Sequence, residues 1–248
     1  MYTRKTSHQK QHKPSTYWMY GKHCCFSAID NKNRNIKEIY CISQLKDDVK
    51  ARFDKTGRII DIQQKNRHEI DALFKYDTVH QGIAMRVSPL STRDLSITSN
   101  MRQILVLDHL TDSHNIGAIW RTADALGAEA IITTRDGTPM ENGVWAKNAS
   151  GTIETLPHIC VTNLASTLKQ LQKQGFWIIG MDGYAQSSIK DVPSYDKMAL
   201  VMGAEGKGMR ELTKKHCDLT AYLPINSSVE SLNVSTATAI ALYELFTL

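Results

Sequence analysis

The chain has 248 residues, of which 42% are hydrophobic and 22% charged, a composition that suits one large globular domain or two smaller ones. No apolar run approaches the roughly 20 residues of a membrane-spanning helix, and the first residues lack the apolar core of a secretion signal. Five cysteines without a C-x-x-C pair argue against a disulfide framework and a zinc site, so we expect a cytoplasmic protein with reduced thiols and no metal.

The net charge of +5 is unevenly distributed along the chain. Residues 1–90 contain 17 Lys and Arg against 9 Asp and Glu, a net charge of +8, whereas residues 91–248 contain 13 against 16, a net charge of −3. An asymmetry of this extent indicates that the first part meets a polyanion such as a nucleic acid, although a solvated surface is the alternative.

The first 88 residues divide into a basic tail and a small folded region. Residues 1–17 carry four Lys or Arg and no acid, so this tail is either an RNA-contacting arm or a frayed terminus. Residues 18–88 alternate between helical and extended patterns, which predicts a small α/β domain with a polar turn at His80-Gln81-Gly82. The predicted helices are 23–29, 45–53 and 67–74, and the predicted extended segments are 36–42, 58–62 and 82–87.

The stretch 89–101 is rich in Ser and Thr and is predicted to link two domains. In residues 102–248, continuous apolar runs alternate with amphipathic helices, which predicts a mostly parallel sheet covered on both faces. Asn115 immediately precedes one predicted helix and is interpreted as its N-cap. The predicted strands are 104–107, 130–133, 176–181 and 198–202, and the predicted helices are 116–126, 164–174 and 234–246.

A glycine-rich loop, residues 203–208, follows the last of these strands. In a Walker A loop the Gly-Lys pair precedes Ser or Thr, but here Lys207 precedes Gly208. A dinucleotide-binding loop reads G-x-G-x-x-G, whereas this one has the reverse order, G-x-x-G-x-G. The loop therefore belongs to neither class, which disfavours a nucleotide-dependent oxidoreductase, but it stands where open α/β sheets bind their ligands.

Five polar side chains near this edge are candidates for chemistry. Asn115 and Arg121 lie six residues apart on an otherwise apolar helix, and Glu205 lies inside the glycine-rich loop. Ser231 and Asn233 precede the last predicted helix, where they are either caps or functional groups. Each of these residues alone is weak evidence, because a solvated arginine, an exposed loop tip and a cap are all common.

Together these residues form three motifs in a fixed order: N-x-G-x-x-x-R-x-A at 115–123, G-x-E-G-x-G at 203–208, and S-L-N-V at 231–234. In this combination the chain, from about 103 to 246, resembles the SpoU-type (TrmH-like) RNA ribose 2′-O-methyltransferases of the SPOUT superfamily. The front part, through YGKHCCFSAI and VHQGIAMRV, resembles the L30e/L7Ae-like RNA-binding domain found in the members that methylate a guanosine of 23S ribosomal RNA.

The resemblance implies a trefoil-knotted C-terminal domain, a homodimer, and S-adenosylmethionine as the cofactor. The matching positions for the cofactor cradle are Gly203, Leu223, Ile225 and Leu232. The matching positions for the methyl-transfer site are Asn115, Arg121, Glu205, Ser231 and Asn233.

The role of Arg121 has two interpretations. The family view often makes this arginine the base that removes the 2′-hydroxyl proton, but a guanidinium stays protonated in proteins and suits an electrostatic clamp better. The sequence thus predicts methylation of a guanosine ribose in 23S rRNA. The alternatives are a tRNA ribose 2′-O-methyltransferase and a non-catalytic RNA-binding or ribosome-assembly protein.

Overall fold

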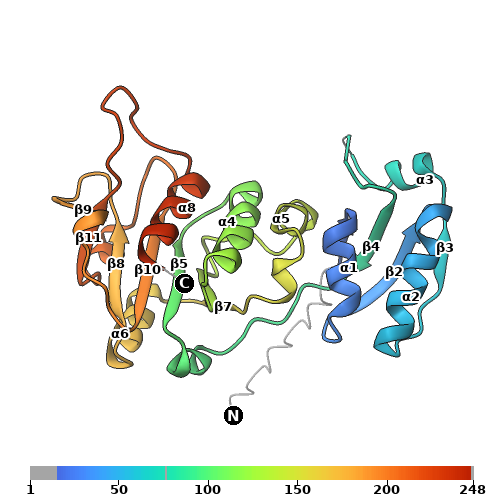
Figure 1. Cartoon of the computed structure of the whole chain (residues 1–248), viewed down its shortest axis with the longest axis horizontal. Helices are drawn as coiled ribbons and strands as arrows, with labels where there is room; N and C mark the ends of the chain where they lie inside the picture. Colours follow the sequence, from blue (N-terminus) through green and yellow to red (C-terminus); the bar gives the residue numbers. More distant parts are fainter. Residues whose placement is uncertain (1–15, 76, 247–248) are drawn as a thin grey trace, which may run out of the picture.

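The computed structural model describes residues 16–75 and 77–246, which form two sheet-centred units: an N-terminal unit, residues 16–88, and a C-terminal unit, residues 102–246 (Figure 1). Of the predicted basic tail, residues 1–15 lie outside this description. Tyr17, which the prediction placed in that tail, is instead the first residue of a strand.

The N-terminal unit is a four-stranded sheet in the order β1-β4-β2-β3 with helices packed against it. Strand β4 pairs antiparallel with β1 and with β2, while β2 and β3 run parallel. The sequence did not predict β1, and it placed the second extended segment, 58–62, a few residues before β3. The elements are β1 (Tyr17–Tyr20), α1 (Lys22–Asp30), β2 (Ile36–Cys41), α2 (Lys46–Thr56), β3 (Ile62–Gln64), α3 (Arg67–Asp71) and β4 (Ile83–Val87).

The C-terminal unit is a seven-stranded sheet in the order β7-β6-β5-β10-β8-β11-β9, in which every pairing is parallel. The predicted α/β class with a mostly parallel sheet is therefore confirmed. The strands are β5 (Gln103–Asp108), β6 (Ala130–Thr134), β7 (His158–Val161), β8 (Trp177–Met181), β9 (Ser187–Ser188), β10 (Met198–Gly203) and β11 (Leu219–Tyr222). The helices are α4 (Ser113–Ala125), α5 (Gly143–Ala149), α6 (Leu164–Lys173), α7 (Glu211–Lys214) and α8 (Val234–Leu245).

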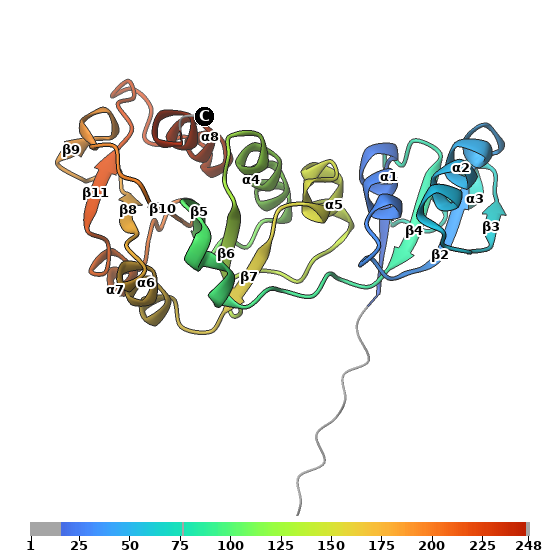
Figure 2. The same cartoon turned by 60° about the horizontal axis from the view of Figure 1, so that its bottom comes forward.

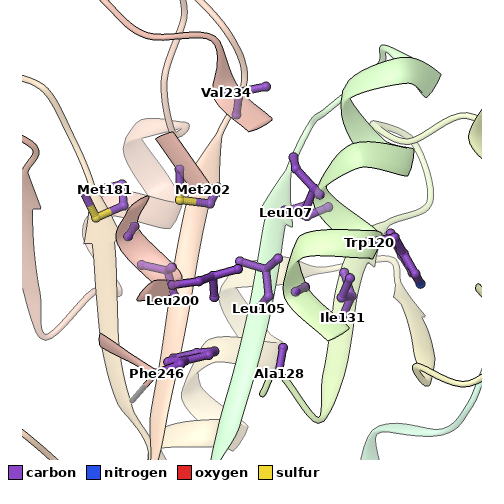
Figure 3. Packing of buried hydrophobic residues seen from close by; sticks show 14 of the residues in the cluster. Leu105, Leu107, Trp120, Ala128, Ile131, Met181, Leu200, Met202, Val234 and Phe246 are labelled. Atoms are coloured by element: carbon purple, nitrogen blue, oxygen red, sulfur yellow. The ribbon is translucent and has the colours of Figure 1, made fainter. Parts of the chain in front are cut away.

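The central strands are apolar throughout because both faces of the sheet are covered. Leu105 and Leu107 of β5, with Leu200 of β10, point to the face covered by α4 and α8 (Figure 3). The alternate residues, such as Val106 and Val201, point to the opposite face, where α6 packs. Alternation within an unbroken apolar run thus serves two separate cores.

Several features of this unit, the short strand β9 among them, differ from the sequence prediction. Helix α5 and strand β7 were not predicted, since neither stretch has a strong apolar period. Asn115 is not the N-cap of α4, because the helix begins at Ser113 and the carboxylate of Asp112 accepts the hydrogen bond from the backbone N–H of His114 at 2.9 Å. The cap prediction was wrong by three residues, and the side chain of Asn115 remains available for another role.

The connection 89–101 packs on the C-terminal unit along its length. The backbone N–H of Arg93 donates to the carbonyl of His158 at 2.7 Å, and Arg93 forms a parallel bridge with Ile159. A 3₁₀ turn follows at Leu95–Asn100, and its buried Thr98 donates to Gln174 at 2.7 Å. The connection therefore continues the β7 edge of the sheet.

Across residues 16–75 and 77–246, no helix combines the length and apolar character needed to cross a membrane. The same residues contain no group of three or more His, Cys, Asp or Glu placed to hold a metal ion. All five cysteines are free thiols, and burial raises the pKa of Cys217 to about 12.

Candidate active site

The candidate site lies where β5 and β10 end. These strands pair in parallel with Gly203 beside Asp108, so their carboxyl ends reach the same edge of the sheet. On one side of the β5–β10 pair the sheet continues with β6 and then β7, and on the other side it continues with β8. The strand order therefore reverses between β5 and β10. An open α/β sheet binds ligands at such a reversal of strand order, because the loops leave it in opposite directions.

Three predicted residues from three separate motifs meet at this edge. The side-chain N–H of Asn115 donates to Glu205 Oε2 at 3.3 Å, and Asn233 Nδ2 donates to Asn115 Oδ1 at 3.0 Å. Asn115 lies in the first turn of α4, Glu205 in the glycine-rich loop, and Asn233 at the start of α8. We call this set the Asn–Glu–Asn group. It joins residues that are 90 and 118 positions apart.

Asn233 has two roles that the sequence treated as alternatives. Its side-chain oxygen caps α8 by accepting from the backbone N–H of Ser235 at 2.9 Å and from the Ser235 hydroxyl at 2.6 Å. Its side-chain N–H points the other way, to Asn115. The cap therefore fixes the orientation of the amide that enters the Asn–Glu–Asn group.

The glycine-rich loop is a tight reversal that needs glycine for two different reasons. The backbones of Ala204 and Gly208 exchange hydrogen bonds of 3.1 and 2.8 Å, which folds the loop back on itself. A Cβ on Gly203 would lie 2.1 Å from the backbone of Gly208 and Met209. Gly206 and Gly208 have φ angles of 76° and 65°, the left-handed region that glycine tolerates. The loop thereby holds Glu205 at its exposed tip.

Asp108 anchors the far end of this loop, a role that the sequence did not predict. Its carboxylate is completely buried and accepts hydrogen bonds from the Arg210 backbone N–H at 3.0 Å and from its Nε and guanidinium N–H groups at 2.8 Å. The only signal in the sequence was an acidic residue ending an apolar strand. This fork ties the loop after β10 to the end of β5.

The predicted cofactor positions come from three segments, and two of them, Gly203 and Leu232, adjoin members of the Asn–Glu–Asn group along the chain. Leu223 and Ile225 follow β11, and Leu232 precedes α8; Leu223 and Leu232 are partly buried, while Ile225 is 41% exposed. Apolar side chains such as Leu232 next to the polar Asn233 are a combination that suits a ligand with an aromatic ring and a polar ribose, as S-adenosylmethionine has. Gly203 differs, because its missing side chain makes room for the loop itself.

Arg121 and Ser231 stand apart from the Asn–Glu–Asn group. Both side chains are exposed, and within the described part of the chain neither makes a hydrogen bond to the group. Six residues of α-helix correspond to about 600° of rotation and about 9 Å of rise, so Arg121 and Asn115 project from different sides of α4.

A series of polar contacts connects the Asn–Glu–Asn group to the N-terminal unit. Next to Asn115, His114 Nδ1 lies 3.3 Å from the side-chain nitrogen of Asn148 on α5. The neighbouring Lys147 Nζ donates to Gln81 Oε1 of the N-terminal unit at 2.9 Å, and that oxygen also accepts from the backbone N–H of Lys22 at 3.0 Å. The predicted turn at Gln81 is confirmed, and its side chain bridges the two units.

Two family models match the chain. Residues 102–243 match the SpoU rRNA Methylase family, and residues 18–93 match the model described as RNA 2′-O ribose methyltransferase substrate binding. The first match contains all three motifs and the whole Asn–Glu–Asn group, and the second contains the basic N-terminal unit.

Curated relatives cover nearly the whole chain. The protein named 23S rRNA (guanosine-2′-O-)-methyltransferase RlmB from Pasteurella multocida is 40% identical over 237 residues, 92% of this chain and 96% of that protein. The protein of the same name from Escherichia coli K12 is 38% identical over 242 residues, 91% of this chain and 96% of that protein.

Solved structures share the fold. The AdoMet-bound rRNA methyltransferase from Sinorhizobium meliloti has a TM-score of 0.77 at 21% identity, covering 92% of this chain and 86% of its own. The SpoU methyltransferase AviRb from Streptomyces viridochromogenes, in complex with AdoMet, has a TM-score of 0.75 at 19% identity, covering 92% and 88%. The TrmH/SpoU tRNA modifying enzyme from A. aeolicus has a TM-score of 0.52 at 27% identity and covers 60% of this chain and 78% of its own.

Proposed function

Because this chain belongs to the SpoU rRNA methylase family, we propose that it transfers a methyl group from S-adenosylmethionine to the ribose 2′-hydroxyl of a guanosine in 23S ribosomal RNA. It is an S-adenosylmethionine-dependent RNA 2′-O-methyltransferase. The observation that carries the proposal is the Asn–Glu–Asn group, in which all three family motifs converge on one edge of the sheet. A non-catalytic RNA-binding protein would not require this convergence.

Bound S-adenosylmethionine supplies an electrophilic methyl group on a sulfonium sulfur. The chain must therefore orient a ribose hydroxyl. That hydroxyl loses its proton to a base as it is methylated. Glu205 is suited to orient the hydroxyl, since Asn115 occupies one carboxylate oxygen and leaves the other as an acceptor. Gly203, Leu223, Ile225 and Leu232 would hold the adenosyl part of the cofactor.

Arg121 would act on the RNA as an electrostatic clamp. A guanidinium remains charged at any physiological pH, so it cannot remove a proton efficiently. Its exposed position on α4, away from the Asn–Glu–Asn group, suits a phosphate of the RNA that reaches over the helix. Ser231, exposed two residues before Asn233, would contact the substrate or the cofactor from the same loop.

The N-terminal unit would be the RNA-binding domain, of the L30e/L7Ae-like type. Its basic character and its match to the substrate-binding model support this assignment. In this division residues 18–88 bind RNA, 89–101 connect, and 102–248 transfer the methyl group. The line from Lys22 and Gln81 through Lys147 to His114 would guide the RNA from one domain to the other.

We further propose a trefoil knot, a homodimer and a cytoplasmic location. After β11, the strand next to the edge strand β9, the chain returns so that helix α8 packs on α4 and β10, which is compatible with a chain end passed through a loop. On α8, Ile240 and Tyr243 are 44% and 75% exposed on one face, a surface that a second copy would cover. A ribosomal RNA substrate and free thiols fit the cytoplasm.

The experiment is a transfer assay with radiolabelled S-adenosylmethionine and 23S rRNA, followed by digestion to nucleosides. We expect the label in 2′-O-methylguanosine. Label in a methylated base, or in tRNA but not in 23S rRNA, would contradict the proposal. Calorimetric binding of NAD in place of S-adenosylmethionine would exclude the whole enzyme class.

A further inference from the structure

A buried ionic cluster joins the two units. Arg34, in the turn between α1 and β2, has a side chain with no exposed area. Its Nη1 lies 2.5 Å from Glu141 Oε1 and its Nη2 lies 2.6 Å from Glu154 Oε1, while its Nε lies 3.0 and 3.1 Å from the two oxygens of Glu154. Both carboxylates belong to the C-terminal unit and are 8% and 2% exposed. We call these three residues the Arg34 cluster.

Neighbouring groups saturate the Arg34 cluster with hydrogen bonds. Asn31 Nδ2 donates to Glu154 at 2.8 Å, and the Tyr17 hydroxyl donates to Glu141. The backbone N–H of Leu90, in the connection, donates to the second oxygen of Glu141 at 3.0 Å. Arg34 also donates to the carbonyl of Ser88 at 2.9 Å. The cluster thus ties together both units and the start of the connection between them.

The surfaces around the Arg34 cluster fit closely. Helix α1 lies across the boundary from α5 (Figure 2), and strand β1 also contacts α5. A Cβ on Gly143 would lie 2.4 Å from the carbonyl of Trp18, and a Cβ on Gly151 would lie 2.3 Å from the hydroxyl of Ser27. Ala146 of α5 is part of the apolar core of the N-terminal unit. The contact therefore specifies one arrangement, not a range of them.

Buried charges are better suited to specifying an arrangement than to strengthening it. Desolvation cancels much of the attraction between buried ions, but any misplacement leaves charges buried without partners. Here one guanidinium satisfies two carboxylates from two separate segments, so a rotated N-terminal unit would leave at least one of them unpaired. The close fit of the surfaces and the Arg34 cluster therefore favour the same arrangement, and the cluster adds a penalty for buried unpaired charge to any departure from it.

We propose that Arg34, Glu141 and Glu154 are positioning residues, which hold the RNA-binding domain at one fixed angle to the methyl site and so select which ribose of a bound RNA is methylated. The inference rests on the proposed function for its consequence, because the selected ribose matters only if the RNA is methylated. The fixed angle between the two units does not depend on activity, so it can be measured in the protein without RNA.

The test is a distance measurement between spin labels on the two units of the full-length protein. Labels at Ala51→Cys on α2 and Ser166→Cys on α6 report the angle, since both positions are exposed. Cys160→Ser and Cys217→Ser remove the partly exposed native thiols. We expect one narrow distance distribution in the otherwise native protein.

Three variants probe the Arg34 cluster. The triple variant Arg34→Met, Glu141→Gln, Glu154→Gln removes every charge without leaving one unpaired, and it should broaden or shift the distribution. Arg34→Lys keeps the charge but loses the planar fork, so it should give an intermediate width and remains informative if the triple variant fails to fold. Arg52→Met removes the exposed ion pair between Arg52 and Asp30 of the same unit and should leave the distance distribution unchanged.

The functional readout is the position and rate of methylation on 23S rRNA at saturating cofactor. We expect the triple variant to lose at least about tenfold in kcat with little change in KM for RNA or in cofactor binding, and to methylate neighbouring riboses. A broad distribution in the native protein, or an unchanged narrow one in both cluster variants, would overturn the inference. Absence of any methyl transfer by the native protein would instead refute the proposed function and leave the measured angle standing.

Discussion

The side-chain N–H of Asn233 donates to the side-chain oxygen of Asn115 across 3.0 Å, although 118 residues separate them. Asn233→Ala removes this contact and also the cap of α8. We expect stability to fall by about 1 kcal/mol from the lost cap and turnover to fall by about 100-fold or more from the displaced Asn115. Thermal melting and single-turnover methylation measure the two effects separately.

Asn163 provides the matched control, because it caps α6 in the same way by accepting from the backbone N–H of Ser166 at 3.0 Å. Asn163→Ala should cost a similar amount of stability with turnover unchanged. Equal losses of turnover in the two variants would show that the effect of Asn233 is only structural.

Gly203→Ala tests whether the fold of the glycine-rich loop creates the cofactor site. The new Cβ would lie 2.1 Å from the backbone of Gly208 and Met209, so the loop must open. We expect a loss of about 3 kcal/mol of stability and of S-adenosylmethionine binding by calorimetry. Gly57→Ala, at a helix end with φ of 69° and open space, should cost about 1 kcal/mol and leave cofactor binding intact. Native cofactor affinity in Gly203→Ala would refute the assignment.

Arg121→Ala should lower turnover by orders of magnitude while melting temperature and cofactor binding persist, since its side chain is exposed and packs against no core. Arg121→Lys separates two roles. A bidentate phosphate clamp fails with lysine, whereas stabilisation of a developing alkoxide is partly retained. Arg102→Ala, an exposed arginine at the opposite end of the sheet, is the control. Native turnover in Arg121→Ala would remove this residue from the site.

His158 makes stability depend on pH. Its ring packs edge-on against Trp120 and Trp145, its Nε2 lies 2.8 Å from the hydroxyl of Thr133, and burial lowers its pKa from 6.5 to about 4. Between these values the unfolded chain binds a proton that the folded chain does not. Stability should therefore fall as pH drops from about 6.5 to about 4, by at most about 3 kcal/mol.

Denaturant unfolding of the native protein and of His158→Phe across this pH range tests the assignment. The phenylalanine keeps the ring packing and cannot titrate, so the slope in this window should shrink. An unchanged slope in His158→Phe would assign the pH dependence to other groups.

Patterns along the chain predicted the strands of the sheet and the residues of the candidate site. They did not predict the contacts that hold those residues in place. The unbroken apolar runs of β5 and β10 predicted buried parallel strands, and the motifs predicted Asn115, Glu205 and Asn233. The Asp108–Arg210 anchor was missed, because a charged pair 102 positions apart leaves no local signal. The cap of α4 was misplaced because Asp112 and Asn115 are both acceptable caps by residue type alone.

The contact between the two units was also invisible in the sequence. Arg34 follows a polar turn, where an arginine is ordinarily solvated, and its partners lie 107 and 120 positions away. From the sequence, small residues such as Gly143 and Gly151 are interpreted as turn residues. In the structure they allow the two units to approach each other closely. Periodicity describes one element at a time and does not predict such contacts.

The central claim is that this chain methylates one guanosine ribose of 23S rRNA. The most direct measurement is a transcript-wide map of ribose methylation in rRNA from cells with and without the gene, and from deletion cells that carry the native chain or the Asn233→Ala variant. We predict that one 2′-O-methylguanosine of 23S rRNA is lost on deletion, restored by the native chain and not restored by the variant. An unchanged 23S rRNA map in the deletion cells, or loss of methylation in tRNA alone, would contradict the account.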